Sequence, residues 1–90
     1  MEQGGECLVS VVVPAFNEEQ AIGPVLDDIL AVMEPLGLPW ELIVVDDGST
    51  DNTRAICEAR PKVQVISHPR NRGNGAARTT GVKAAKGRYI

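Results

Sequence analysis

Short apolar runs alternate with longer, mixed polar and apolar segments along the chain. The runs are rich in β-branched residues and end at proline or at polar turn residues, a pattern typical of strands buried on both faces of a sheet. We therefore predict strands over residues 8–13, 41–45 and 63–66, and the start of a fourth strand over residues 88–90.

The segments between these runs have the spacing of helices. Apolar residues recur at helical intervals over residues 25–33, and Pro24 falls in the first turn, where its missing N–H carries no cost. A shorter helix is predicted to end before Pro61. A third helix, built mostly of small residues, is predicted over residues 76–86, with Gly87 as its C-terminal cap.

This β-α-β-α-β-α-β order predicts a three-layer α/β/α fold, with a mostly parallel sheet, right-handed crossovers and helices on both faces. The strand order expected for such a sheet is 3-2-1-4. Because the pattern stops within the fourth strand, we interpret residues 1–7 as a tail and residues 8–90 as an incomplete domain; the alternative is a minimal domain with a short last strand. A first strand with an open edge predicts homo-oligomers, formed through that edge or through exposed helix faces.

The composition is that of a folded domain. The 90 residues are 43% hydrophobic and 23% charged, which excludes intrinsic disorder. No apolar run approaches the roughly 20 residues that span a bilayer. The aromatic residues are few (Phe16, Trp40 and Tyr89), which argues against a base-stacking surface. We therefore expect no membrane segment in this chain and no nucleic-acid partner.

Charge is divided unevenly along the chain, although the net charge is only −3. Residues 1–53 carry eleven acidic residues and no lysine or arginine, whereas residues 54–90 carry all nine basic residues and one acid, Glu58. Such asymmetry predicts either a basic arm for nucleic acid or a site whose two walls carry opposite charge, unless folding mixes the two halves.

The two cysteines and the single histidine do not indicate a metal site. Cys7 and Cys57 lie fifty residues apart without a CxxC spacing, and His68 is not at a zinc-ligand spacing from either. We expect both thiols to be reduced, as in a cytoplasmic protein. His68 precedes Pro69 in a predicted loop, so we expect it to be exposed and assign it no chemistry.

Three polar segments follow the predicted strands, at residues 14–19, 46–49 and 70–78. In parallel sheets, ligands bind beyond the carboxyl ends of the strands. Asp46 and Asp47 are adjacent and point in opposite directions, so one carboxylate can face a crevice while the other braces the turn.

The carboxylate that faces the crevice would accept hydrogen bonds from a base N–H or a ribose hydroxyl, or hold a metal through oxygen. Asp-Asp-Gly is also a common turn. Free N–H groups at the start of the third helix, together with Arg72 and Arg78, suit a diphosphate. Neither a G-x-G-x-x-G fingerprint nor a P-loop is present. Gly81 is interpreted as permitting close packing of the helix on the sheet.

Together, these segments resemble the N-terminal half of family 2 glycosyltransferases, which have the Rossmann-like GT-A fold. Within that family they are most similar to the polyprenyl- and dolichyl-phosphate sugar transferases. The matching stretches are residues 11–19, 43–53 and 71–78, and the similarity continues through Gly81, Ala85, Gly87 and Tyr89.

The resemblance implies inverting transfer of a sugar from a UDP- or GDP-sugar to an acceptor such as a polyprenyl phosphate, with Mg²⁺ or Mn²⁺ in the full-length enzyme. The family's D-x-D metal motif, acceptor site and base lie beyond the position of Ile90, so the 90 residues alone are expected to bind no metal and to be inactive. Many members have lysine at the position of Asn74, a cation that Arg72 or Arg78 would replace. The residues that match nucleotide-binding positions are Pro14, Ala15, Phe16, Glu18, Asp46, Asp47, Gly48, Arg72, Gly73, Asn74 and Arg78.

Three other interpretations stay open from the sequence. One is a non-catalytic module for nucleotide binding or protein interaction. Another is a response-regulator receiver, but a whole β-α unit precedes the acidic pair here and no aspartate follows Asp51. A third, a dinucleotide-binding fold with Asp47 on a ribose, requires glycines after the first strand. The glycosyltransferase interpretation requires Asp47 to lie near both Phe16 and Gly73.

Overall fold

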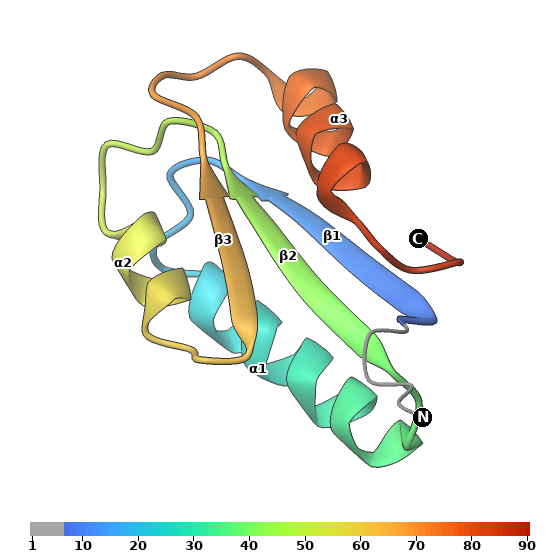
Figure 1. Cartoon of the computed structure of the whole chain (residues 1–90). Helices are drawn as coiled ribbons and strands as arrows, with labels where there is room; N and C mark the ends of the chain where they lie inside the picture. Colours follow the sequence, from blue (N-terminus) through green and yellow to red (C-terminus); the bar gives the residue numbers. More distant parts are fainter. Residues whose placement is uncertain (1–6) are drawn as a thin grey trace.

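A computed structural model describes residues 7–90 and shows a parallel sheet between helices (Figure 1). The predicted tail, residues 1–7, lies outside the described residues except for Cys7. The elements in chain order are β1 (Val9–Ala15), α1 (Ile22–Met33), the 3₁₀ turn η2 (Glu34–Leu36), β2 (Trp40–Asp46), α2 (Thr53–Glu58), β3 (Val63–Ser67) and α3 (Asn74–Ala84).

The sheet has β2 at its centre, with β1 on one side and β3 on the other, and both pairs are parallel. Ala15 aligns with Asp46, which in turn aligns with Ser67, so the three strands end level with one another. Tyr89 forms an isolated parallel bridge to Val9. The predicted neighbours of the first three strands are therefore confirmed, and the chain after α3 returns to the β1 edge, where the fourth strand is expected.

The helices cover both faces of the sheet, as predicted: α1 and α2 lie on one side and α3 lies on the other (Figure 1). Successive residues of β2 alternate between two cores, because neighbouring side chains in a strand point to opposite faces. The core beneath α1 and α2 contains Ala15, Ile22, Leu26, Leu42, Val44, Cys57 and Val63, and the core beneath α3 contains Ile43, Val45 and Ala77.

Full burial on both faces describes β2 but not β1. Leu42, Ile43, Val44 and Val45 are completely buried, whereas most of β1 is only half-buried. The prediction of a doubly buried first strand is therefore wrong within the described residues. The cause is topological: β1 borders β2 on one side only, and a single bridge lies on its other side.

Cys57 belongs to the core beneath α2, and both cysteines are free thiols. Burial raises the pKa of the Cys57 thiol to about 11, so the group stays protonated at neutral pH. A protonated buried thiol packs as a small apolar side chain and is not a nucleophile.

The boundaries of α3 differ from the prediction, and Gly87 is not its cap. The helix both begins and ends two residues earlier than expected, and Ala85 turns into an extended conformation with φ −69° and ψ 138°. Glu41 is the reason, because its carboxylate accepts the Lys86 N–H at 2.6 Å and the Ser10 hydroxyl at 2.6 Å. The Gly87 N–H donates in turn to Ser10 Oγ at 2.8 Å. These bonds draw the chain out of the helix and toward β1.

Pro14 also lies inside β1 rather than at its end, so the strand extends two residues beyond the predicted range. Proline is tolerated at the border of a sheet because the missing N–H need not face a partner strand there. The extension carries the chain to Ala15, whose carbonyl accepts the Asp47 N–H at 2.8 Å.

Gly81 allows α3 to lie directly on the sheet, as the sequence suggests. A Cβ atom at this position would lie 2.2 Å from Val12 Cγ1 and 3.2 Å from Val45 Cγ2. Real Cβ atoms do not approach a neighbour so closely, and both valines are held in strands. The absence of a side chain therefore sets the distance between α3 and the sheet.

We predict that Gly81→Ala destabilises the fold by about 1–3 kcal/mol through overpacking, in spite of the higher helix propensity of alanine. Gly75→Ala is the matched control in the same helix, since no atom lies within 4 Å of its added Cβ. The control is expected to be neutral or to stabilise by up to about 1 kcal/mol. Urea unfolding followed by circular dichroism measures both, and equal effects would contradict the packing argument.

Candidate functional site

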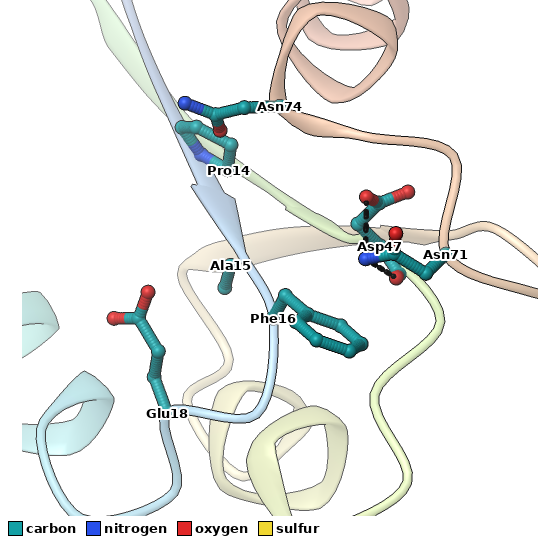
Figure 2. Close-up of a pocket in the computed structure, with 7 residues that line it drawn as sticks. All are labelled: Pro14, Ala15, Phe16, Glu18, Asp47, Asn71 and Asn74. Carbon is teal, nitrogen blue, oxygen red and sulfur yellow. Dashed lines mark hydrogen bonds between the residues drawn. The ribbon is translucent and has the colours of Figure 1, made fainter.

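The end of β1 and the segments that follow β2 and β3 border one pocket, a cavity of about 330 Å³. Glu18 lies on one side of Ala15 and Phe16, with Asp47 and Asn71 on the other (Figure 2). The lining residues come from the end of β1 and the loop after it, from the residue after β2, from the loop after β3 and from the first residue of α3: Pro14, Ala15, Phe16, Glu18, Asp47, Asn71 and Asn74. Because parallel strands end at the same edge, distant parts of the sequence meet here.

Hydrogen bonds join the loop after β1 to the loop after β2. The Asn17 N–H donates to Ser49 Oγ at 2.9 Å, and Asn17 Oδ1 accepts the Thr50 N–H at 2.8 Å. The Glu18 N–H donates to Thr53 Oγ1 at 2.8 Å. Asn17 adopts a left-handed conformation with φ 50°, which asparagine tolerates better than most residues. The segment that forms one wall of the pocket is therefore fixed to the end of β2.

Asp47 joins the other wall of the pocket to β2. Its buried carboxylate accepts four hydrogen bonds. Oδ1 accepts from His68 Nδ1 at 2.7 Å and from the Arg72 N–H at 3.0 Å. Oδ2 accepts from the Gly73 N–H at 2.8 Å and from Asn71 Nδ2 at 3.1 Å. One carboxylate thus orients the whole loop that leads into α3.

These donors keep Asp47 ionised. The hydrogen bond from His68 lowers the pKa of the Asp47 carboxyl most, and the Arg72 and Gly73 N–H groups lower it further against the opposing effect of burial. A buried carboxylate that accepts several hydrogen bonds is stabilised in its charged form. The pocket therefore holds a fixed negative charge at neutral pH.

Gly48 lets the loop after β3 cross directly over the end of β2. It has a positive φ of 77°, and a Cβ atom there would lie 2.3 Å from the Arg70 carbonyl carbon and 2.4 Å from the Asn71 nitrogen. Both the backbone conformation and the close approach exclude a side chain. Gly48 thus shapes the pocket without lining it.

His68 is buried rather than exposed, so the expectation from the sequence is wrong at this position. The residue is 8% exposed, and its Nδ1 and Nε2 lie 2.7 Å from Asp47 Oδ1 and 2.8 Å from Thr80 Oγ1. The signal that would have revealed this is its place directly after β3. Asp47 directly follows β2, and parallel strands bring such positions side by side.

The remaining predicted site residues lie around the pocket in different roles. Asp46 is buried, and its Oδ1 accepts the Ser49 N–H at 3.4 Å. Arg72 and Gly73 contribute backbone N–H groups to Asp47. The exposed Arg78 borders a separate groove, lined by β1 and by later residues of the chain. Asp47 thus lies near both Phe16 and Gly73, the proximity that the sequence interpretation requires.

Folding mixes the acidic and basic halves of the sequence. Arg60 forms a two-point ion pair with Asp27 on α1, and Lys62 pairs with Glu34. Among residues 7–90, the pocket is lined by two acids and two asparagine amides, without lysine or arginine. The uneven charge pattern is therefore partly used in ion pairs away from the pocket.

Ligand-type side chains are dispersed over the described residues. Within residues 7–90 no three histidine, cysteine, aspartate or glutamate side chains gather as a metal-binding group. Asp47 also directs its carboxylate oxygens to protein donors. In the same part of the chain, no helix has both the length and the apolar character needed to cross a membrane.

Comparisons with known proteins match this chain to a family. The family model "Glycosyl transferase family 2" matches residues 10–90. A dodecaprenyl-phosphate galacturonate synthase from Rhizobium johnstonii is 43% identical over 89 residues, covering 91% of this chain and 26% of that protein. A dolichyl-phosphate β-glucosyltransferase from Saccharomyces cerevisiae is 37% identical, covering 93% of this chain and 28% of that protein.

A solved structure of related fold contains a nucleotide. Glucosyl-3-phosphoglycerate synthase from Mycobacterium tuberculosis, in complex with UDP, matches with a TM-score of 0.73 and 35% identity over 93% of this chain and 31% of that one. The same enzyme has been solved with Mn²⁺ and UDP-glucose. The chain thus spans between 26% and 31% of the length of these relatives.

We predict that Asp47 contributes stability at neutral pH that is lost in acid. Its pKa is lowered in the folded state, so the contribution is complete above the ordinary aspartate value of about 4 and disappears as the pH falls through the folded value. Asp47→Asn should therefore lower the urea midpoint at pH 7 and flatten its decline between about pH 5 and pH 2.

Asp27→Asn is the comparison variant. Arg60 lowers the pKa of the Asp27 carboxyl through a hydrogen bond, but this carboxylate lies in solvent, where water screens the pair. The slope of the urea midpoint against pH is expected to change less in Asp27→Asn than in Asp47→Asn. An unchanged slope in Asp47→Asn would show that the hydrogen bonds to Asp47 do not stabilise its charged form.

Proposed function

This chain belongs to glycosyl transferase family 2, and from that premise we propose that its pocket binds the nucleotide part of a UDP- or GDP-sugar. In the complete protein, the sugar would be transferred with inversion to an acceptor such as a polyprenyl phosphate. The single observation that supports this proposal is the convergence of Phe16, Asp47 and the start of α3 on one pocket at the strand ends. Membership of this family removes the receiver and dinucleotide-binding alternatives.

The nucleoside is proposed to lie over the end of β1. Phe16 is 41% exposed and borders the pocket, so its ring is available for a base or a ribose. Pro14 and Ala15 form an apolar floor beneath it, and Glu18 offers an acceptor for ribose hydroxyls. Related enzymes in complex with UDP and with GDP-mannose support a nucleotide of this class.

Asp47 is proposed to accept a hydrogen bond from the base or the ribose. A carboxylate has about four lone-pair sites, and protein donors already use all of them in this structure. A nucleotide donor would therefore replace one of these bonds. The side-chain donor Asn71 is the partner expected to yield, because it borders the pocket and its bond to the carboxylate, at 3.1 Å, is the longest of the four.

The diphosphate is proposed to lie at the start of α3. The first turn of this helix offers backbone N–H groups, whereas the N–H groups of Arg72 and Gly73 before it are bound to Asp47. A helix N-terminus attracts anions. Asn74 borders the pocket, and Arg78 follows it by one helical turn, on the same side of α3. Arg72 is exposed in the adjoining loop. Arg72, or Arg78 if its side chain leaves the separate groove that it borders here, would supply the cation that many members carry at the position of Asn74.

Mg²⁺ or Mn²⁺ is assigned to the D-x-D motif that the family resemblance places after the position of Ile90. A divalent cation there would neutralise the charge that develops on the leaving diphosphate. We propose that three other predicted residues shape the nucleotide site rather than hold a metal: Asp46, Gly48 and Gly73. Cytoplasmic location, and association of copies through the free side of β1 or through helix faces, stay predictions.

We predict that Phe16→Ala weakens UDP or GDP binding by about tenfold, within the roughly 1–3 kcal/mol of aromatic–base stacking. Isothermal titration of the complete protein measures the change. Tyr89→Ala is the matched control, since it removes an aromatic ring at the opposite end of β1. Equal affinity in Phe16→Ala and wild type would contradict the placement of the nucleoside.

We also predict that the 90-residue chain by itself forms no product from UDP- or GDP-sugars, whereas the complete protein does. The physical reason is that the D-x-D motif, which the family resemblance places after the position of Ile90, would hold the cation that stabilises the leaving diphosphate. A radiolabelled transfer assay with polyprenyl phosphate compares the two. Product formed by the 90 residues alone would contradict this prediction. Nucleotide binding without sugar transfer by the complete protein would favour a non-catalytic module.

A further inference from the structure

We propose that His68 is a positioning residue of the nucleotide pocket, acting through Asp47 to hold the wall formed by the loop before α3. This inference rests on the proposed function, because it concerns how the same pocket keeps its shape. His68 does not line the pocket itself.

The backbone of His68 is held beside the end of β2. Its N–H donates to the Asp46 carbonyl at 2.9 Å, continuing the ladder between β2 and β3. The side chain then lies between the end of β2 and the middle of α3, with Asp47 on one ring nitrogen and Thr80 on the other. The side chain of His68 therefore connects the residue after β2 with helix α3.

The donor and acceptor roles follow from the partners. An ionised carboxylate only accepts hydrogen bonds, so Nδ1 of His68 carries the proton toward Asp47. In the neutral ring, Nε2 is then an acceptor, and the hydroxyl of Thr80 donates to it. Asp47 therefore selects the tautomer, and the hydroxyl of Thr80, which can donate or accept, satisfies Nε2.

The bond from His68 restricts the orientation of the Asp47 carboxylate. With Oδ1 held toward the imidazole, the same oxygen accepts the Arg72 N–H, and Oδ2 faces the Gly73 N–H. These two N–H groups precede α3, so their bonds fix the loop wall relative to β2. Without the imidazole donor, three donors still bind the carboxylate, but its orientation and that of the loop are less restricted. Nucleotide binding must then order them further, which weakens affinity.

Two amide replacements separate the two ends of the histidine. The amide nitrogen of asparagine reaches about as far as Nδ1, whereas that of glutamine reaches about as far as Nε2. His68→Asn can therefore still donate to Asp47, and His68→Gln can bond Thr80 but does not present a donor at the Nδ1 position. His68→Leu removes both bonds while keeping an apolar side chain in the site.

The experiment titrates UDP and GDP into the complete protein and its variants. We expect His68→Leu and His68→Gln to bind about tenfold more weakly than wild type, and His68→Asn to bind within about threefold. Thermal unfolding of each variant identifies any that do not fold. An affinity of His68→Leu within twofold of wild type, or an affinity of His68→Asn as low as that of His68→Leu, would overturn the proposal.

A double-mutant cycle with Asp47→Asn distinguishes positioning from a general loss of stability. If His68 acts through Asp47, adding His68→Leu to Asp47→Asn should weaken nucleotide binding no further, whereas independent effects would multiply. Multiplying effects would overturn the proposal. If the wild-type protein binds neither UDP nor GDP, the proposed function fails; if it binds and the His68 variants bind equally well, only this inference fails.

Discussion

The carboxylate of Asp47 is the group on which the geometry of the pocket depends. A buried charge is costly unless donors surround it, and here four donors from the segment after β3 meet one carboxylate at the end of β2. The hydrogen bonds that stabilise this charge are therefore the same bonds that hold the loop in place. The loop before α3 forms a wall of the pocket because the Asp47 carboxylate binds its N–H groups.

A second carboxylate acts similarly at the opposite end of β2. Glu41 accepts from the Ser10 hydroxyl, from the Gln64 amide and from the Lys86 N–H. The segment before α3 is thus bound to Asp47 and the segment after it to Glu41, while Gly81 lets its middle approach the sheet. Helix α3 has few large apolar side chains, so polar anchors at both ends compensate for limited hydrophobic burial.

The family match relates this fold to known glycosyl transferases. The chain spans only part of the length of its relatives. The described residues supply an aromatic ring, a fixed negative charge and a helix N-terminus around one pocket. These features support the proposed nucleotide site.

Hydrophobic patterning alone determined the order and type of the elements, because the apolar runs of β2 and β3 and the helical spacing of α1 need no knowledge of distant residues. The motifs at the strand ends likewise indicated which segments meet, since parallel strands end at one edge. Tertiary structure alone decided the burial of His68, the half-exposed state of β1 and the early end of α3. Each of these depends on a partner far away in the sequence: Thr80 and Asp47 for the histidine, a neighbouring strand for β1, and Glu41 for the helix. Local pattern carries no information about such partners, because their contacts form only once the sheet and its crossovers are in place.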